Sequence, residues 1–200
     1  MRKIWIQSAF LLTAMILMPG CQKEDSNPNH GIVTDPDGQE YLWKEMKDRR
    51  VWILENLNYD IEGHNSWWYD NDPANGEVYG RLYDWEAALA ACKTLGGDWH
   101  LATDQEWKNL ANAYGGYFDW EIDKEIGNAQ NGYDALISGG ESGFSAQLAG
   151  IRISTFQGLS EYGSYWTATP ADDYYTWFFS FEDQDPKLDR NGGRATMGFS

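Results

Sequence analysis

Two helix signals in the middle of the chain restrict the folds that are open to it. Asp84 can N-cap a helix through Leu95, because apolar residues recur at helical spacing until Gly96-Gly97 ends the pattern. The sequence Thr103-Asp104-Gln105-Glu106 is a capping box, in which the Thr and Glu side chains satisfy the backbone at each other's position. It predicts a second helix to about Tyr114. The chain therefore carries a central pair of helices.

Strand signals flank this pair on both sides. Asp35-Pro36-Asp37-Gly38 is a turn, and Gln39–Met46 and Arg50–Leu54 are predicted to form a hairpin. A short helix is one interpretation of Asp119–Ile126. Further strands are predicted over residues 143–153, 164–169, 174–181 and 194–199. An N-terminal hairpin, two central helices and C-terminal antiparallel strands predict a single α+β domain.

The N-terminus has the pattern of a bacterial export and anchoring signal. Residues 1–20 combine a basic start with an apolar stretch from Ala9 to Met18, which is too short to cross a membrane as a helix. Gly20-Cys21 resembles a lipobox, so we expect Cys21 to be lipidated and to begin the mature protein. The alternative is an ordinary secretory signal followed by a chance Cys.

Residues 21–30 read as a polar tether, and residues 31–200 as one folded domain. Lys23-Glu24-Asp25 resembles the signal that carries lipoproteins to the outer face of the outer membrane in Bacteroidota. We therefore expect an envelope protein that faces the exterior. With Cys21 acylated, only Cys92 remains, on the apolar face of a predicted helix. The domain then has no internal disulfide and depends on packing.

The charge of the chain excludes one class of partner. It carries 31 acidic and 15 basic residues, and removing Arg2 and Lys3 takes its formal charge from −16 to −18. Nucleic acid is not an expected partner, because binding through phosphates needs a basic surface. Aromatic residues make up 16% of the chain, which is enough to build a core and argues against disorder.

Five motifs occur in order along the domain: residues 52–57, 79–88, 99–107, 142–146 and 165–169. In this order they resemble the Fibrobacter succinogenes major paralogous domain, which is common in bacterial lipoproteins. The resemblance covers roughly residues 31–200, and it implies a C-type-lectin-like fold, with paired terminal strands and a ligand-displaying region of long loops.

The chain departs from the pattern of this family at several positions. Family members often carry Cys where Trp68 and Gly76 stand, and Pro where Ala102 stands. They also often place a Cys near the C-terminus, and this chain has none there. These departures leave the fold expectation intact, but the C-terminal strand has no disulfide to hold it.

The residue inventory predicts a protein that is not an enzyme. No Ser or Cys nucleophile is tied by spacing to His30, His64 or His100. Acidic pairs such as Asp172/Asp173 arise by chance in so acidic a chain and do not indicate a glycosidase. The formylglycine-generating enzymes of the lectin-like class use reactive Cys residues, and Cys92 alone does not reproduce a pair. No cofactor is expected.

Calcium is considered as a ligand because clustered Asp residues supply the hard oxygen atoms that it accepts. The candidates are Asp70 and Asp72 in one segment and Asp183 and Asp185 in another. The triplets of lectin-like calcium sites do not occur in this chain. Solvated acidic turns explain the same residues, so we predict no metal site.

Aromatic rings beside polar groups point to glycan binding as a candidate activity. The segment comprises Trp67, Trp68, Tyr69, Asp70, Asn71 and Asp72. Sugars bind where flat apolar rings meet groups that hydrogen-bond hydroxyls. The alternative is that these rings belong to the core, although two adjacent Trp residues in a loop do not easily both point inward.

The sequence therefore predicts an envelope-anchored lipoprotein whose domain binds a polysaccharide or a surface protein without catalysis. Its membrane contact is the lipid on Cys21. A structural or assembly role at the cell surface, without a small ligand, is the alternative.

Overall fold

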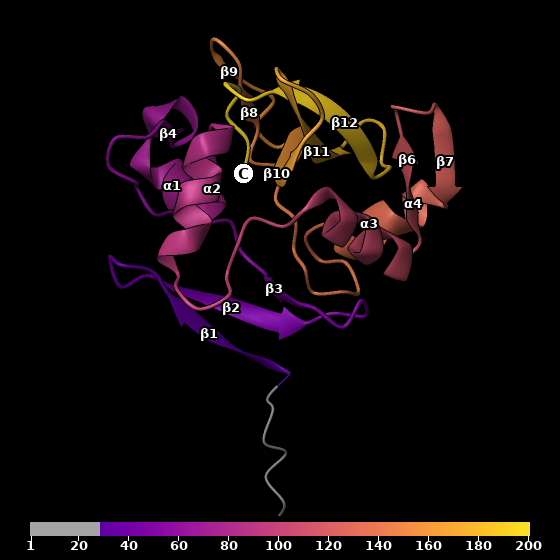
Figure 1. Cartoon of the computed structure of the whole chain (residues 1–200), viewed down its shortest axis with the longest axis horizontal. Helices are drawn as coiled ribbons and strands as arrows, with labels where there is room; N and C mark the ends of the chain where they lie inside the picture. Colours follow the sequence, from indigo (N-terminus) through magenta and orange to yellow (C-terminus); the bar gives the residue numbers. More distant parts are fainter. Residues whose placement is uncertain (1–28) are drawn as a thin grey trace, which may run out of the picture.

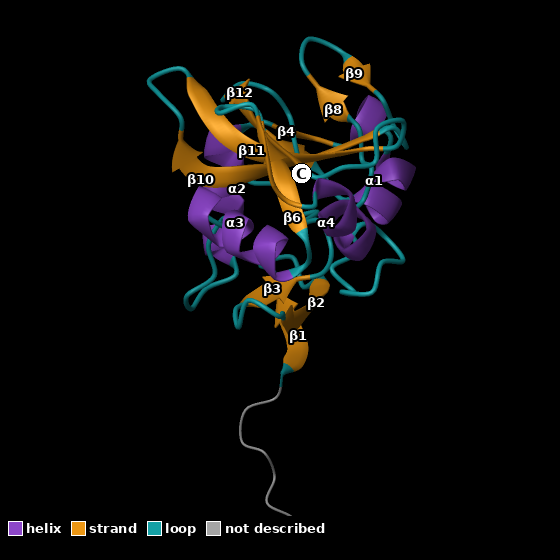
Figure 2. Ribbon diagram, turned by 90° about the vertical axis from the view of Figure 1, so that its right-hand side faces the viewer, coloured by secondary structure: helices purple, strands orange, loops and turns teal. Residues whose placement is uncertain are grey.

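The computed structural model describes residues 29–200. The predicted signal segment, the lipidation residue Cys21 and most of the tether lie outside these described residues. Within them, no helix combines the length and the apolar character needed to cross a membrane. As the sequence predicted, the fold is a single α+β domain (Figures 1 and 2). The described residues form four α-helices and several mainly antiparallel sheets.

A three-stranded antiparallel sheet begins the described chain, with strands β1 (His30–Thr34), β2 (Glu40–Glu45) and β3 (Val51–Ile53) in that order. The β2–β3 hairpin is the one predicted from sequence, and β1 extends it through the turn at Asp35. The Asp35 carboxylate accepts hydrogen bonds from two backbone N–H groups of that turn and from the Tyr41 hydroxyl. Figure 1 shows this sheet below the rest of the domain.

The two central helices form where their caps predicted them, as α2 (Trp85–Thr94) and α3 (Asp104–Ala113). The Asp84 carboxylate accepts from the N–H of Ala87 at 2.9 Å, and both bonds of the Thr103–Glu106 capping box are present. The chain leaves α2 through two consecutive positive-φ glycines, which stop the helix.

A five-stranded sheet forms the other side of the domain, in the order β10-β11-β12-β6-β7. Its strands are β10 (Tyr162–Pro170), β11 (Tyr175–Glu182), β12 (Asp189–Arg194), β6 (Gly116–Asp119) and β7 (Lys124–Gly127). All neighbours are antiparallel except β12 and β6, which pair in parallel.

Several short elements connect these parts. They are β4 (Ser66–Trp67), the 3₁₀ turn η1 (Tyr69–Asn71), α1 (Pro73–Tyr79), β5 (Leu82–Tyr83), α4 (Ala129–Leu136), β8 (Ile151–Arg152) and β9 (Phe156–Gln157). Strands β4 and β5 pair with each other, as do β8 and β9. The pairs are too short to stand alone and depend on the packing around them.

Three secondary-structure predictions were wrong. The segment Asp119–Ile126 belongs to the β6–β7 hairpin and is not a helix, because β6 pairs with β12 as well as with β7; Asp123 takes a positive φ at the turn. The helix comes later, as α4, where the Asn128 side chain caps the N–H of Asn131. Residues 143–153 are mostly irregular, and the last regular strand ends at Arg194, the residue at which the predicted strand 194–199 begins.

The last residues are held by single bridges and not by a strand. Phe199 bridges Tyr83, and Gly198 bridges Arg152. In the described residues β1 pairs with β2 alone, so the pairing of terminal strands implied by the lectin-like comparison is not present. The lectin-like character of the fold stays a prediction.

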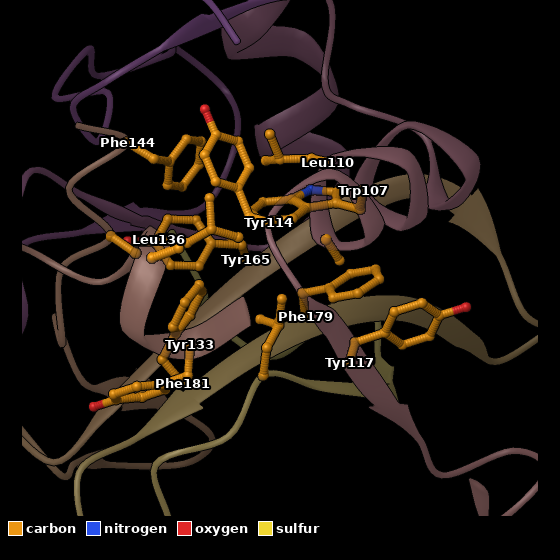
Figure 3. Close-up of a cluster of buried hydrophobic side chains, with 14 of the residues drawn as sticks. Trp107, Leu110, Tyr114, Tyr117, Tyr133, Leu136, Phe144, Tyr165, Phe179 and Phe181 are labelled. Atoms are coloured by element: carbon orange, nitrogen blue, oxygen red, sulfur yellow. The ribbon is translucent and has the colours of Figure 1, made fainter. Parts of the chain in front are cut away.

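Two aromatic clusters hold the domain together. The larger packs α3, α4, β10 and β11 around Trp107, whose ring stacks on Phe179 at a centroid distance of 5.2 Å (Figure 3). Trp52 of β3 joins this cluster with its ring centroid 5.3 Å from that of Trp107, and so attaches the N-terminal sheet. The smaller cluster packs the Ala-rich face of α2 on Trp166 and Phe199.

Candidate functional site

A half-open cleft of about 650 Å³ lies between the N-terminal sheet and the body of the domain. One wall is the chain from Arg49 to Leu57, which includes β3. The facing wall includes residues 98–102, which connect α2 to α3, and Figure 1 shows this connection descending from α2 toward the three-stranded sheet. The volume is in the range of sites for small molecules or peptide segments.

The cleft is lined chiefly by apolar groups. Seven aromatic side chains contribute to its walls besides Tyr83: Trp43, Trp52, Trp99, Trp107, Phe144, Tyr165 and Trp166. Five of these seven belong to buried cores, so the deep part of the cleft is shaped by side chains that packing already fixes. Trp99 is half-buried and lies on the α2–α3 connection. The site is thus a preformed apolar surface with a few polar groups.

The main polar feature of the cleft is a network of hydrogen bonds and ion pairs around Glu106, which lies in the first turn of α3. Its carboxylate accepts from the Thr103 N–H at 2.8 Å and from the Thr103 hydroxyl at 2.9 Å. Arg50 lies 2.9 Å from Oε1, and His100 Nε2 lies 3.1 Å from Oε2. One capping residue therefore ties the α3 start to the hairpin wall and to the α2–α3 connection.

The network raises the pKa of His100 and lowers the pKa of Glu106. A hydrogen bond to the Asp98 carbonyl, and then the Glu106 carboxylate, raise the pKa of His100 against the effect of burial. Burial by itself would raise the pKa of Glu106, but the Thr103 and His100 hydrogen bonds outweigh it and the pKa is lowered. These shifts favour a charged His100–Glu106 pair at the cleft.

Cys92 lines the cleft from α2, on the apolar helix face that the sequence predicted. Its relative exposure is intermediate, yet burial of the thiol raises its pKa to about 12. The sulfur is enclosed although part of the residue is accessible. At neutral pH the group is a thiol, and the thiolate is the nucleophilic form.

The structure places the predicted glycan-binding segment outside this cleft, from β4 to the start of α1. The Arg152 guanidinium lies 4.0 Å from the ring centroid of Trp67, and that of Arg81 lies 4.3 Å from Trp68. Trp68 Nε1 donates to Asn58 at 2.8 Å, and Tyr69 packs on Phe156 with ring centroids 5.3 Å apart. All three rings are half-buried in contacts within the chain.

The polar residues of the same segment are exposed. Asp70 and Asn71 both have positive φ, and the Asp72 carboxylate caps α1 by accepting from the Ala74 N–H at 3.0 Å. The structure brings the rings and the acids into one surface segment, but it directs the two Trp rings toward arginines, Tyr69 toward Phe156, and the acids toward solvent or the backbone. Glycan binding at Trp67–Asp72 stays a prediction of the sequence.

The four acidic calcium candidates fall into two separate turns. Asp70 lies within η1 and Asp72 directly follows it, whereas Asp183 and Asp185 are exposed in the β11–β12 turn, where Asp185 pairs with Lys187 at 2.8 Å. Between residues 29 and 200, no three His, Cys, Asp or Glu residues gather in a way that could hold a metal ion.

The residues of the cleft were not recognised as a site from the sequence. A signal was present, since each of the five family-like motifs supplies lining residues, among them Asn56, Tyr83, Trp99, Phe144 and Trp166. Packing is also part of their role, since Trp107 and Trp166 of these motifs are buried, and the sequence alone does not separate a site from a core. Only the fold shows that they converge on one accessible space.

Comparison with known proteins gives one family. No curated protein and no solved structure matches the chain. The family model described as the Fibrobacter succinogenes major domain matches residues 45–197, a span that contains every motif given above. The chain therefore belongs to the Fibrobacter succinogenes major domain family.

Proposed function

We propose that this protein is a non-catalytic binding protein of the bacterial envelope and that the aromatic cleft is its ligand site. The observation that supports the proposal is the convergence of all five family-like motifs on one apolar, half-open cleft. The cleft has a volume of about 650 Å³ and mostly apolar walls, which is the kind of site where a small ligand can bury most of its surface.

The polar groups at the cleft support binding over catalysis. Glu106 is already engaged by Thr103, Arg50 and His100, and the Cys92 thiol is held protonated. Neither group is a poised base or nucleophile of the kind that enzymes place in a pocket. The polar network instead fixes the geometry of the wall.

The anchor is the second part of the proposal and rests on the sequence of residues 1–21. We propose that Cys21 carries lipid and holds the domain at the outer membrane, facing the exterior. In cells, Cys21→Ala should move the protein from the membrane fraction to the soluble envelope fraction. Continued membrane association of the Cys21→Ala protein would refute lipidation as the anchor.

An apolar fluorescent probe, 8-anilinonaphthalene-1-sulfonate, tests the cleft directly. We expect saturable binding by the folded protein, and a loss of affinity of fivefold or more in Trp99→Ala. Trp120→Ala is the matched control, because Trp120 is 51% exposed and does not line the cleft. Equal binding by the two variants, or no binding to the native protein, would overturn the assignment of the site.

A further inference from the structure

The cleft meets the N-terminal sheet along a strand edge. The chain from Arg49 to Leu57 lines it without a gap. A strand that presents a face contributes alternate residues, because successive side chains point to opposite sides. An unbroken run therefore indicates that the cleft lies along the edge of β3, where the backbone itself borders the space.

The hydrogen-bonding groups of this edge are open. In the described residues β3 pairs with β2 alone. The Leu54 N–H donates to the Leu42 carbonyl and the Met46 N–H to the Arg50 carbonyl, so residues 50, 52 and 54 bond to β2. The N–H and C=O groups of Val51 and Ile53 then point away from β2. None of the backbone bonds found between residues 29 and 200 outside the strand pairings uses them.

The facing wall is also irregular backbone, and it too has backbone N–H and C=O groups without a partner in the described residues. Residues 98–102 have no helix or strand assignment. The Ala102 carbonyl accepts from Ala168, but in the part of the chain that the structure describes no backbone bond uses the N–H or C=O of Leu101. Unpaired backbone at the border of an apolar space favours an occupant that carries its own donors and acceptors.

One end of the cleft is basic although the protein is strongly acidic. The β2–β3 hairpin carries Lys44, Lys47, Arg49 and Arg50 within seven positions, in a chain with 15 Lys and Arg in all. The side chains of Arg49 and Arg50 are 86% and 48% exposed, and both border the cleft. In the described residues each pairs with an acid through Nη1 alone, Arg49 with Glu45 and Arg50 with Glu106, and a guanidinium has further N–H donors. An acidic group on a ligand is therefore favoured at this end.

We propose that the cleft binds an extended segment of a partner protein, which joins the β1-β2-β3 sheet as a fourth strand beside β3. Its backbone pairs with the open groups of Val51 and Ile53, alternate apolar side chains enter the cleft, and an acidic side chain lies against Arg49 and Arg50. The proposal rests on the proposed function and names the ligand class for the same site.

A peptide differs from the glycan considered above in the hydrogen-bonding groups of its backbone. Strand addition obtains affinity from main-chain hydrogen bonds and specificity from pockets for alternate side chains. The open edge of β3 offers the main-chain hydrogen bonds, and the aromatic walls of the cleft offer the pockets for side chains. A sugar or an alkyl chain has no donors and acceptors at the repeat of a strand.

A phage-displayed library of random seven-residue peptides is the probe. Selection on the purified full chain should return alternating apolar peptides that carry an acidic residue. A selected peptide is then resynthesised with N-methyl groups at successive positions. Methylation at every second position should weaken binding tenfold or more, while the positions between tolerate it, because only alternate N–H groups face β3.

Two variants test the protein side of the interface. Val51→Pro removes an N–H that points to the cleft and none that pairs with β2, so it should weaken the peptide tenfold or more, whereas Val51→Ala should have little effect. Arg49→Gln should weaken peptides that contain an acidic residue, and Lys124→Gln on β7 is its control. Folding of each variant is checked by its Tm, and the N-methyl series on the native protein does not depend on any variant.

The outcomes distinguish the two proposals. If the anilinonaphthalene probe binds but the library returns no peptide, the strand-addition proposal falls and the cleft stands as a ligand site. If neither binds, both fall. Peptide binding that is indifferent to the position of N-methylation also overturns strand addition.

Discussion

The Arg190 guanidinium holds the Asp104 carboxylate through two hydrogen bonds, of 2.6 Å from Nε and 3.1 Å from Nη2. Arg190 lies on β12, and Asp104 lies in the first turn of α3, 86 residues earlier. The same guanidinium contacts Asp119 at 3.0 Å and Glu121 at 2.8 Å, and it covers the Trp177 ring at 3.5 Å. This buried ion cluster fixes α3 on the five-stranded sheet, and α3 in turn presents Glu106 to the cleft.

Asp104→Ala should destabilise the protein by about 3–5 kcal/mol, because it leaves the guanidinium of Arg190 buried with part of its charge uncompensated. Urea unfolding measures the change. Glu121→Ala is the matched control: its side chain is 52% exposed, and its loss should cost less than about 1 kcal/mol. Equal losses of unfolding free energy in the two variants would show that burial does not decide how much each carboxylate contributes to stability.

The His100–Glu106 pair should make stability depend on pH. The pKa of His100 is raised above 6.5, so its contribution is complete below pH 6.5 and is lost as the pH rises through the folded-state pKa. The pKa of Glu106 is lowered below 4.5, so its contribution is present above pH 4.5 and is lost as the pH falls through the folded-state pKa. Both contributions are present between these limits.

His100→Gln should therefore lower the Tm at pH 5.5 and change it little at pH 8.5. The effect is modest, under about 1 kcal/mol, because the His100 side chain is 55% exposed. His64→Gln, in an exposed loop, is the control. A loss that is the same at both pH values would mean that the imidazole contributes packing and not charge.

Asp189→Asn should stabilise the protein at neutral pH. Burial raises the pKa of the Asp189 carboxyl from 3.8 to about 6, and its Oδ1 atom has no hydrogen-bond partner in the described residues. The ionised group therefore opposes folding above about pH 6, and this cost disappears as the pH falls below 3.8. We expect a gain of roughly 1–3 kcal/mol at pH 8 and almost none at pH 3.5.

Thermal unfolding at the two pH values measures the Asp189→Asn effect. Asp185→Asn serves as its control, because Asp185 is 60% exposed and pairs with Lys187 on the surface. A destabilised Asp189→Asn protein at pH 8 would show that the carboxylate has a partner that offsets its burial.

Trp68→Ala should cost about 2–4 kcal/mol, since the ring packs on the backbone of Gly76 and on the buried Arg81 guanidinium. Trp120→Ala, which removes an equally large but exposed ring, should cost less than about 1 kcal/mol. A glycan array with the native protein and with Trp67→Ala tests the glycan prediction for the same segment. Unchanged stability in Trp68→Ala would mean that its contacts with Gly76 and Arg81 contribute little.

Local signals in the sequence determined the secondary structure near the two central helices. Asp84 and the Thr103–Glu106 box define α2 and α3 because a cap acts within a few residues, and the residues that act are adjacent in the chain. The β2–β3 hairpin and the family followed in the same way from short motifs. The α+β class followed from the order of these elements.

The tertiary structure alone decided the rest. The helix predicted at Asp119–Ile126 is a hairpin because β6 gains a partner in β12, a contact between segments about 70 residues apart that no local pattern encodes. The cleft also depends on contacts between segments that are distant in the sequence. Its walls are β3, the α2–α3 connection and the loop at Phe144, and they come together only when the N-terminal sheet packs on Trp107. Burial and contact are properties of the folded chain, so the sequence supplied the motifs and the fold placed them around one cleft.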